Sequence, residues 1–146
     1  MTQNLIKGEE HPLCKVFSAD FEYHIPQYQR PYAWTTEEAG AMLSDLLDFY
    51  ETEKDDNYFL GSIVLVKEEG APCSEVIDGQ QRLTTLTILF AAVASLLPEG
   101  DFRDDCETYI NEPGKPTQGL KAAPRLYLRN RDQPFFNQYI QKSDIK

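Results

Sequence analysis

The segment from Leu83 to Leu97 constrains what this chain can fold into more than any other feature. Nearly every position in it is apolar or small, and the main interruptions are three threonines. A helix with so little polar surface must be buried on most sides, so we expect it at the centre of the fold. A chain of 146 residues can form one domain with a core around such a helix, and two full domains are not expected.

Short strand patterns surround this helix in the sequence. Apolar and polar residues alternate over 21–25, which is the period of a half-buried strand that Pro26 should end. Residues 58–66 are rich in β-branched and aromatic side chains, and together with 74–77 they predict a hairpin. The alternation over 125–129 predicts a further strand. The chain therefore combines strands with helices.

Two more helices and one irregular connection complete the pattern. Thr35 and Glu38 form a capping box, after which apolar residues recur at helical spacing up to Tyr50. Asp132 is placed to cap a shorter helix near the end of the chain. Residues 98–124 combine glycines and prolines with an acidic cluster, which predicts a mobile connection.

Charge and composition limit the kinds of partner. The formal net charge of −10 disfavours a broad electrostatic grip on DNA, because nonspecific binding needs many Lys and Arg beside the phosphates. Acidic residues gather over 51–56, 68–69 and 99–107, so any anion site should be a small basic pocket elsewhere. The sequence has neither a signal-peptide pattern nor a run long enough to span a membrane, which predicts a cytoplasmic protein.

The cysteines and histidines predict no metal or catalytic site. Cys14, Cys73 and Cys106 are far apart, odd in number, and form no Cys-x-x-Cys pair. His11 and His24 have no ligand or triad partner at a suggestive spacing. We therefore expect reduced, structural thiols and assign the histidines no catalytic role.

The sharpest motif is Asp78-Gly79-Gln80-Gln81-Arg82, which joins a strand pattern to the buried helix. Glycine allows a tight turn that leaves the first helical amides pointing outward, and such amides bind anions. Arg82 offers a planar fork for a phosphate, and Asp78 could hold Mg²⁺ or polarise a water. Gln80 and Gln81 could orient a water or a base edge. The same residues would also suit a plain turn with exposed glutamines and a surface ion pair.

A second cluster of aromatic and polar residues occupies the loop after Pro26. Tyr28-Gln29-Arg30 could stack a base and hold a phosphate. Tyr32 and Trp34 also fit a hydrophobic staple under the following helix, which leaves the Tyr-Gln-Arg trio as the better site candidate. Since both motifs follow strands, we expect Gln29 and Arg30 to line one pocket with Asp78 and Arg82.

Three linked motifs resemble one known family. They are Ile25-Pro26-x-Tyr28-Gln29-Arg30-x-Tyr32-x-Trp34, Phe59-Leu60-Gly61-Ser62-Ile63-Val64, and Asp78-Gly79-Gln80-Gln81-Arg82-Leu83. In this order, and followed by 125–128, Asp132 and Phe136, they resemble the amino-terminal domain of GmrSD-type restriction proteins. The resemblance extends from about Phe17 to Ile140, and three linked motifs are far more specific than one.

This resemblance implies a ParB/sulfiredoxin-like α/β fold, in which a small mixed sheet packs with helices. It implies that Asp78 to Arg82 belong to a site that hydrolyses GTP or ATP with Mg²⁺, and that Tyr28 to Arg30 form its wall or sense DNA modification. Family members usually continue into an HNH-type nuclease domain, whose signatures this chain lacks, so the chain would be an amino-terminal fragment. Expected partners are a nucleotide, DNA through the full-length protein, and that nuclease domain, with a homodimer left open.

Two interpretations of function stay open on the sequence alone. In the first, the domain is a nucleotide-hydrolysing regulator of a restriction system that defends against phage by acting on modified or foreign DNA. Arg82 and the helix amides would then stabilise phosphate charge while Gln80 or Gln81 positions water. In the second, it is a nonhydrolytic sensor of DNA modification, in which residues 28–34 contact the duplex. A ParB-like clamp controlled by nucleotide has no independent sign in the sequence.

Overall fold

The main sheet of the domain is mixed and has four strands. The computed structural model describes residues 8–52, 57–68 and 70–142. β1 (Glu22–His24) runs parallel to β3 (Cys73–Asp78) and to β6 (Leu126–Tyr127), and β2 (Val64–Lys67) is antiparallel to β3. The strand order is β2-β3-β1-β6. The mixed sheet with its helices confirms the α/β class, and the likeness to ParB and sulfiredoxin stays a prediction.

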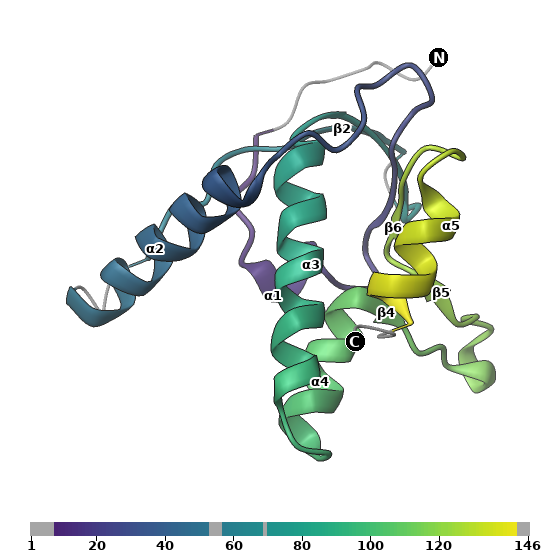
Figure 1. Cartoon of the computed structure of the whole chain (residues 1–146). Coiled ribbons are helices and arrows are strands. Elements are labelled where there is room, and N and C mark those ends of the chain that lie inside the picture. Colours follow the sequence, from purple (N-terminus) through teal and green to yellow (C-terminus); the bar gives the residue numbers. More distant parts are fainter. Residues whose placement is uncertain (1–7, 53–56, 69, 143–146) are drawn as a thin grey trace.

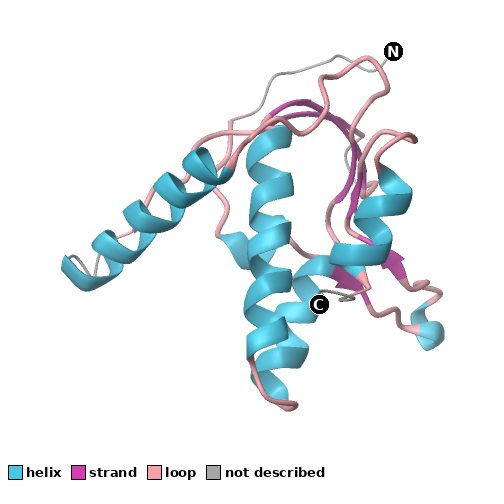
Figure 2. Cartoon of the chain, in the orientation of Figure 1, coloured by secondary structure: helices cyan, strands magenta, loops and turns pink. Residues whose placement is uncertain are grey.

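The predicted central helix is α3 (Gln80–Leu96), which follows β3 directly and packs on one face of the sheet (Figure 1). α4 (Asp101–Ile110) lies alongside it. A short helix α5 (Gln133–Phe136) continues into the π-helical turn η2 (Asn137–Gln141), which also contacts α3 (Figure 2). α1 (Leu13–Val16) precedes the first strand.

The core lies between α3 and the inner face of the sheet. Strand residues alternate between the two faces, so β1 contributes Tyr23 and β3 contributes Val76, and both are fully buried. Each large apolar side chain removed from water contributes about 1.5–3 kcal/mol, which makes this cluster the main source of stability. Its buried members are Phe17, Tyr23, Ile25, Val76, Leu83, Leu86, Leu126 and Phe136.

The capping-box helix forms as predicted but projects away from the body. α2 spans Thr36–Thr52, and the Thr35 amide donates to Glu38 Oε2 at 2.8 Å. Hydrogen bonds from Thr35, first of all from its hydroxyl, hold the pKa of the Glu38 carboxyl below its ordinary value. Figure 1 shows the helix standing away from the rest of the domain. None of its residues is buried, and Leu47 is 52% exposed. The described chain leaves much of the apolar side of α2 in solvent.

Three expectations are corrected by the structure. The strand predicted over 58–66 begins only at Val64, because Gly61 has a φ of 118° and interrupts the extended run. Asp132 stands at the start of α5 without capping it, since its carboxylate pairs with Arg129 Nε at 2.9 Å. Of the acidic residues noted in the sequence, 53–56 and Glu69 lie outside the described residues.

The third correction concerns 98–124, which is more than a connection. It contains α4, the 3₁₀ turn η1 (Pro116–Gln118), and a small antiparallel sheet of β4 (Asn111–Glu112) and β5 (Ala123–Pro124). The prolines and glycines that suggested a loop gather after Glu112, so they leave α4 intact. The mobility of this segment stays a prediction. Within the described ranges, no helix is both long and apolar enough to cross a membrane.

Tyr23 should make the domain less stable at alkaline pH. Its hydroxyl donates to the Val16 carbonyl at 2.7 Å. Burial raises its pKa well above the ordinary value, against a smaller opposite effect of Arg125. Above about pH 10 the unfolded chain releases this proton while the folded chain keeps it. The free energy of unfolding should therefore fall as pH rises, by up to about 1.4 kcal/mol per pH unit.

Tyr23→Phe should remove this part of the pH dependence and cost about 1 kcal/mol near neutral pH, where only the hydrogen bond is lost. Urea unfolding of both proteins at about pH 8 and about pH 11 makes the comparison. The difference in free energy of unfolding between wild type and variant should become smaller or change sign at the higher pH. The same difference at both pH values would show that release of the Tyr23 proton is not linked to unfolding.

Candidate functional site

The junction between β3 and α3 forms the centre of the candidate site. Asp78 ends the strand, Gly79 turns the chain with a φ of 98°, and the helix begins at Gln80. A Cβ on Gly79 would lie 2.3 Å from Ile63 Cγ2, so both the backbone angle and the space require glycine. The first i→i−4 hydrogen bond of the helix is donated by the Leu83 amide to the Gly79 carbonyl at 3.1 Å.

The start of α3 is consequently an uncapped cluster of donors. The first amides of any helix have no intrahelical partner, and here no side chain of the described residues caps them. These amides carry the positive end of the helix dipole. A site of this kind attracts phosphate groups.

Asp78 and Arg82 flank these amides as unpaired charges. Both side chains are exposed, and neither makes a hydrogen bond or ion pair with the described part of the chain. A Cβ on Gly61 would lie 2.6 Å from Arg82 Cζ, so the guanidinium lies directly against the Gly61 backbone. The glycine of the Phe-Leu-Gly-Ser segment thus makes room for the arginine of the other motif.

Glutamine side chains join the loop after β1 to this junction. Gln29 Nε2 donates to the Ile77 carbonyl at 3.1 Å, and Gln80 Nε2 donates to Gln29 Oε1 at 3.3 Å. Side chains of the two motifs are therefore in contact. Arg30, on the same loop, is exposed and has no ion pair among the described residues.

Gln81 fastens the rest of the loop to α3. Its Oε1 accepts from the amides of Ala33 at 2.8 Å and Trp34 at 3.2 Å, and its Nε2 donates to the Pro31 carbonyl at 3.2 Å. Both polar atoms of the side chain are thus committed to backbone groups of the loop. The arrangement favours a role in holding the loop over the predicted role in positioning water.

The aromatic residues of the loop divide into two groups. The Tyr32 hydroxyl is 2.9 Å from Thr85 Oγ1, so Tyr32 contacts α3, and Trp34 is half-buried. The expected staple under α2, the helix that follows the loop, stays a prediction. Tyr28 is 72% exposed, and its hydroxyl reaches Glu75 Oε1 only at 3.4 Å. Of the three aromatic side chains, Tyr28 alone is presented to solvent.

A small pocket lies where the loop, α3 and the segment after β6 meet. Its volume is about 10 Å³, which is room for about one water molecule. Arg30, Gln80 and Gln81 line it, but Gln29, Asp78 and Arg82 do not. This pocket therefore does not bring together all four residues predicted to share one, Gln29, Arg30, Asp78 and Arg82. The pocket is lined by Ile25, Arg30, Pro31, Tyr32, Gln80, Gln81, Thr84, Leu128, Arg129 and Asp132.

Arg129 is a site residue that sequence reasoning missed. Its Nη1 donates to the Gln29 carbonyl at 3.3 Å while its Nε pairs with Asp132 at 2.9 Å. The Asn130 amide also donates to Gln27 Oε1 at 3.1 Å. The strand pattern over 125–129 gave Arg129 no role beyond alternation. Its only signal was its place within the last stretch of family resemblance.

Gln81→Ala should loosen the loop without unfolding the domain. The change removes three hydrogen bonds, but the groups are near solvent, so we expect a loss of about 1–2 kcal/mol. The amides of Ala33 and Trp34 should exchange their hydrogens at least about tenfold faster, which is 1.4 kcal/mol of local opening. Gln138→Ala, at an exposed position of η2, is the matched control. Equal exchange in both variants would exclude the anchoring role.

Comparison with known proteins places the chain in a family. A family model described as the GmrSD restriction endonuclease N-terminal domain matches residues 13–146. No curated protein matches the chain. The match covers the sheet, α3 and both motifs of the candidate site. This chain therefore belongs to the family of GmrSD restriction endonuclease N-terminal domains, which are modules of DNA-restriction systems.

Proposed function

We propose that this domain binds and hydrolyses a nucleoside triphosphate at the β3–α3 junction and so regulates a nuclease of its restriction system. The observation that carries the proposal is the uncapped start of α3, flanked by Asp78 and Arg82, two charges without an ion pair among the described residues. Uncapped amides beside an unpaired arginine suit a phosphate.

Electrostatics favour a small anion over a duplex. The chain carries a formal charge of −10, so a long run of phosphates would meet repulsion over most of the surface. A triphosphate needs only a local site. Arg82, the helix amides and, from the facing loop, Arg30 could supply the positive groups.

Asp78 fits the Mg²⁺ that accompanies a triphosphate. Mg²⁺ is commonly held by one or two carboxylates together with phosphate oxygens and water. Asp78 offers one exposed carboxylate next to the amides that would hold the phosphates. When bound, the ion would neutralise charge on the phosphate oxygens.

The two glutamines should have different roles. Gln81 uses both polar atoms to hold the loop, whereas Gln80 uses only its Nε2, in the bond to Gln29. Gln80 Oε1 has no hydrogen bond within the described residues, so it can accept one from a water. We assign the orientation of water to Gln80 and the anchoring of the loop to Gln81.

The loop should move when nucleotide binds. The loop after β1 contacts the junction through Gln29, which bonds to the Ile77 carbonyl and to Gln80, so phosphates bound at the start of α3 would disturb these bonds. The same loop carries Trp34, the one tryptophan of the chain. Binding at the junction would thus change the position of a surface loop, which is a means of signalling to a nuclease domain. Trp34 fluorescence should report it.

Arg82→Ala should weaken binding of GTP or ATP with Mg²⁺ by roughly 10- to 100-fold, because a hydrogen bond to a charged group contributes about 1.5–3 kcal/mol. Stability should change by less than about 0.5 kcal/mol, since the side chain is exposed. Arg131→Ala is the control, because Arg131 is also exposed and lies outside the junction. Affinity is measured by calorimetry. Equal affinities in the two folded variants would remove Arg82 from the site.

Hydrolysis is tested separately, by phosphate release under single-turnover conditions. Asp78→Asn should lower the rate and raise the Mg²⁺ concentration needed for half-maximal release. Gln80→Ala should lower the rate by roughly 10²-fold or more while leaving nucleotide affinity nearly unchanged, as expected for a residue that acts on water. If the wild type bound the nucleotide but released no phosphate, the domain would be a nucleotide sensor and not a hydrolase.

A further inference from the structure

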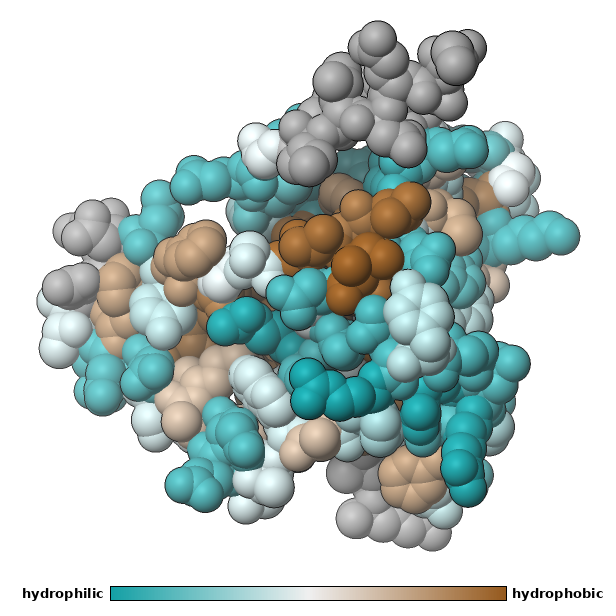
Figure 3. Space-filling model, turned by 90° about the horizontal axis from the view of Figure 1, so that it is seen from above, coloured by the Kyte–Doolittle hydropathy of each residue, from teal (hydrophilic) through white to brown (hydrophobic). Residues whose placement is uncertain are grey.

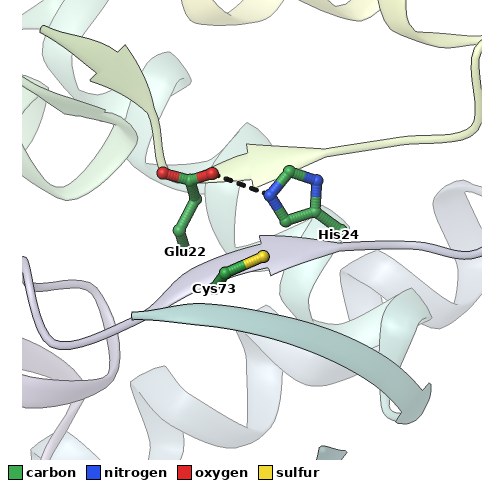
Figure 4. A group of neighbouring side chains, drawn as sticks. All are labelled: Glu22, His24 and Cys73. Carbon is green, nitrogen blue, oxygen red and sulfur yellow. Dashed lines mark hydrogen bonds and ion pairs between the residues drawn. The ribbon is translucent and has the colours of Figure 1, made fainter. Parts of the chain in front are cut away.

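The outer face of the sheet brings together three side chains with different metal-ligand atoms. Glu22 and His24 are two residues apart on β1, so they point to the same face. Cys73 on β3 is paired with Glu22 in the parallel register and shares that face. Figure 4 shows the carboxylate, imidazole and thiol converging above the two strands. This is the face opposite to the core.

The three ligand atoms are close enough to share one ion. All lie within 4.8 Å of one another, and His24 Nε2 is 2.7 Å from Glu22 Oε1. Bonds of about 2.0–2.3 Å to a tetrahedral zinc place neighbouring ligand atoms roughly 3.5 Å apart. The separation of the Glu22 and His24 atoms is below that value, and the Cys73 sulfur lies within 4.8 Å of both. Small rotations of exposed side chains would complete the geometry.

The neighbouring strand orients the imidazole. The Tyr127 ring stacks on His24 with centroids 4.6 Å apart and planes within 5° of parallel. Glu75 is the register partner of His24 on β3 and adds a second carboxylate to the same face. The side chains of Glu22 and His24 are 37% and 40% exposed, so an ion can reach them from solvent. The site is therefore preorganised, accessible and negative.

We propose that Glu22, His24 and Cys73 bind Zn²⁺, with the fourth coordination position open. A thiol and an imidazole favour zinc over Mg²⁺ or Ca²⁺, which prefer oxygen ligands. Binding displaces the thiol proton to solvent, and the thiolate forms the bond to the metal. The site is separate from the nucleotide site, because Cys73 and Asp78 are at opposite ends of β3, roughly 16 Å apart. It does not depend on the proposed nucleotide function.

Titration with Zn²⁺ and Co²⁺, on reduced protein without an affinity tag, tests this inference. We expect one ion per chain and a rise in melting temperature. Cys73→Ser and His24→Asn should each weaken Zn²⁺ binding at least about tenfold. Co²⁺ should give a sulfur-to-metal charge-transfer band in the wild type. That band should be lost in Cys73→Ser, since its origin is the thiolate.

Two variants elsewhere are matched controls. Cys14→Ser removes another exposed thiol. His11→Asn breaks the pair of His11 with Glu9, which has the same spacing in sequence and a 3.0 Å contact but belongs to no three-ligand cluster among the described residues. Both should bind Zn²⁺ like the wild type. Zn²⁺ affinity that survives in folded Cys73→Ser, or a Co²⁺ complex without the charge-transfer band, would overturn the inference.

Discussion

Gly79→Ala should destabilise the domain by about 2–6 kcal/mol, enough to unfold a domain of ordinary stability in part. An alanine at a φ of 98° stores about 1–3 kcal/mol of backbone strain. Its Cβ would also lie 2.3 Å from Ile63 Cγ2 and 3.1 Å from the Ile63 Cα, so the segment just before β2 must shift at a further cost of about 1–3 kcal/mol. The junction that holds the candidate site would be displaced as a result.

Gly40→Ala is the matched control for this change. Gly40 lies in the exposed helix α2, and a Cβ there would meet nothing within 4 Å. Alanine should stabilise the helix by up to about 1 kcal/mol. Denaturant unfolding at equal m-value compares the two variants. If Gly79→Ala were as stable as Gly40→Ala, the tight turn at the start of α3 would be wrong.

Arg125→Met should cost about 3–5 kcal/mol, because it breaks a buried ion pair and leaves one charge behind. Arg125 Nη2 is 3.1 Å from Glu112 Oε2, and the two side chains are 7% and 12% exposed. Arg125 Nε also donates to the Thr108 carbonyl. The pair joins the end of α4 and the small sheet to β6. Its loss should lower the melting temperature by many degrees.

A second substitution separates lost attraction from the buried charge. In the wild type the Gly114 amide donates to Glu112 Oε1 at 2.9 Å. Glu112→Gln keeps an oxygen that can accept this bond. The double variant Arg125→Met with Glu112→Gln should recover much of the stability, since the uncompensated carboxylate is gone. Chemical unfolding of the wild type, the two single variants and the double variant gives the coupling free energy between the two side chains. A double variant less stable than Arg125→Met would show that packing of the arginine stem, not charge, dominates.

Local patterns predicted much of the fold. Residues close together in the sequence determine the capping box of α2, the apolar run of α3 and the β2–β3 hairpin. The pattern failed for α4, whose sequence is mostly acidic and polar. A helix this short is marginal by itself and forms because it packs along α3. That contact depends on the chain reversing after α3, which no local pattern states.

The candidate site was predicted in its parts but not in its assembly. The glycine turn and the helix amides follow from the order of residues. The contact of Arg82 with Gly61 and the bond from Arg129 to Gln29 join distant segments. The same is true of His24 and Cys73, whose proximity depends on the register of parallel strands. Spacing along the chain could not reveal any of these, because the sheet order decides which segments meet.

Calorimetric titration of the intact chain is the most direct test of the central claim. GTP and ATP are titrated with Mg²⁺, and modified and unmodified duplex DNA is titrated under the same conditions. The account predicts saturable binding of a triphosphate at one site per chain, a matching change in Trp34 fluorescence, and little binding of either duplex. Saturable binding of modified duplex, with no binding of either nucleotide, would contradict it and favour a nonhydrolytic sensor of DNA modification.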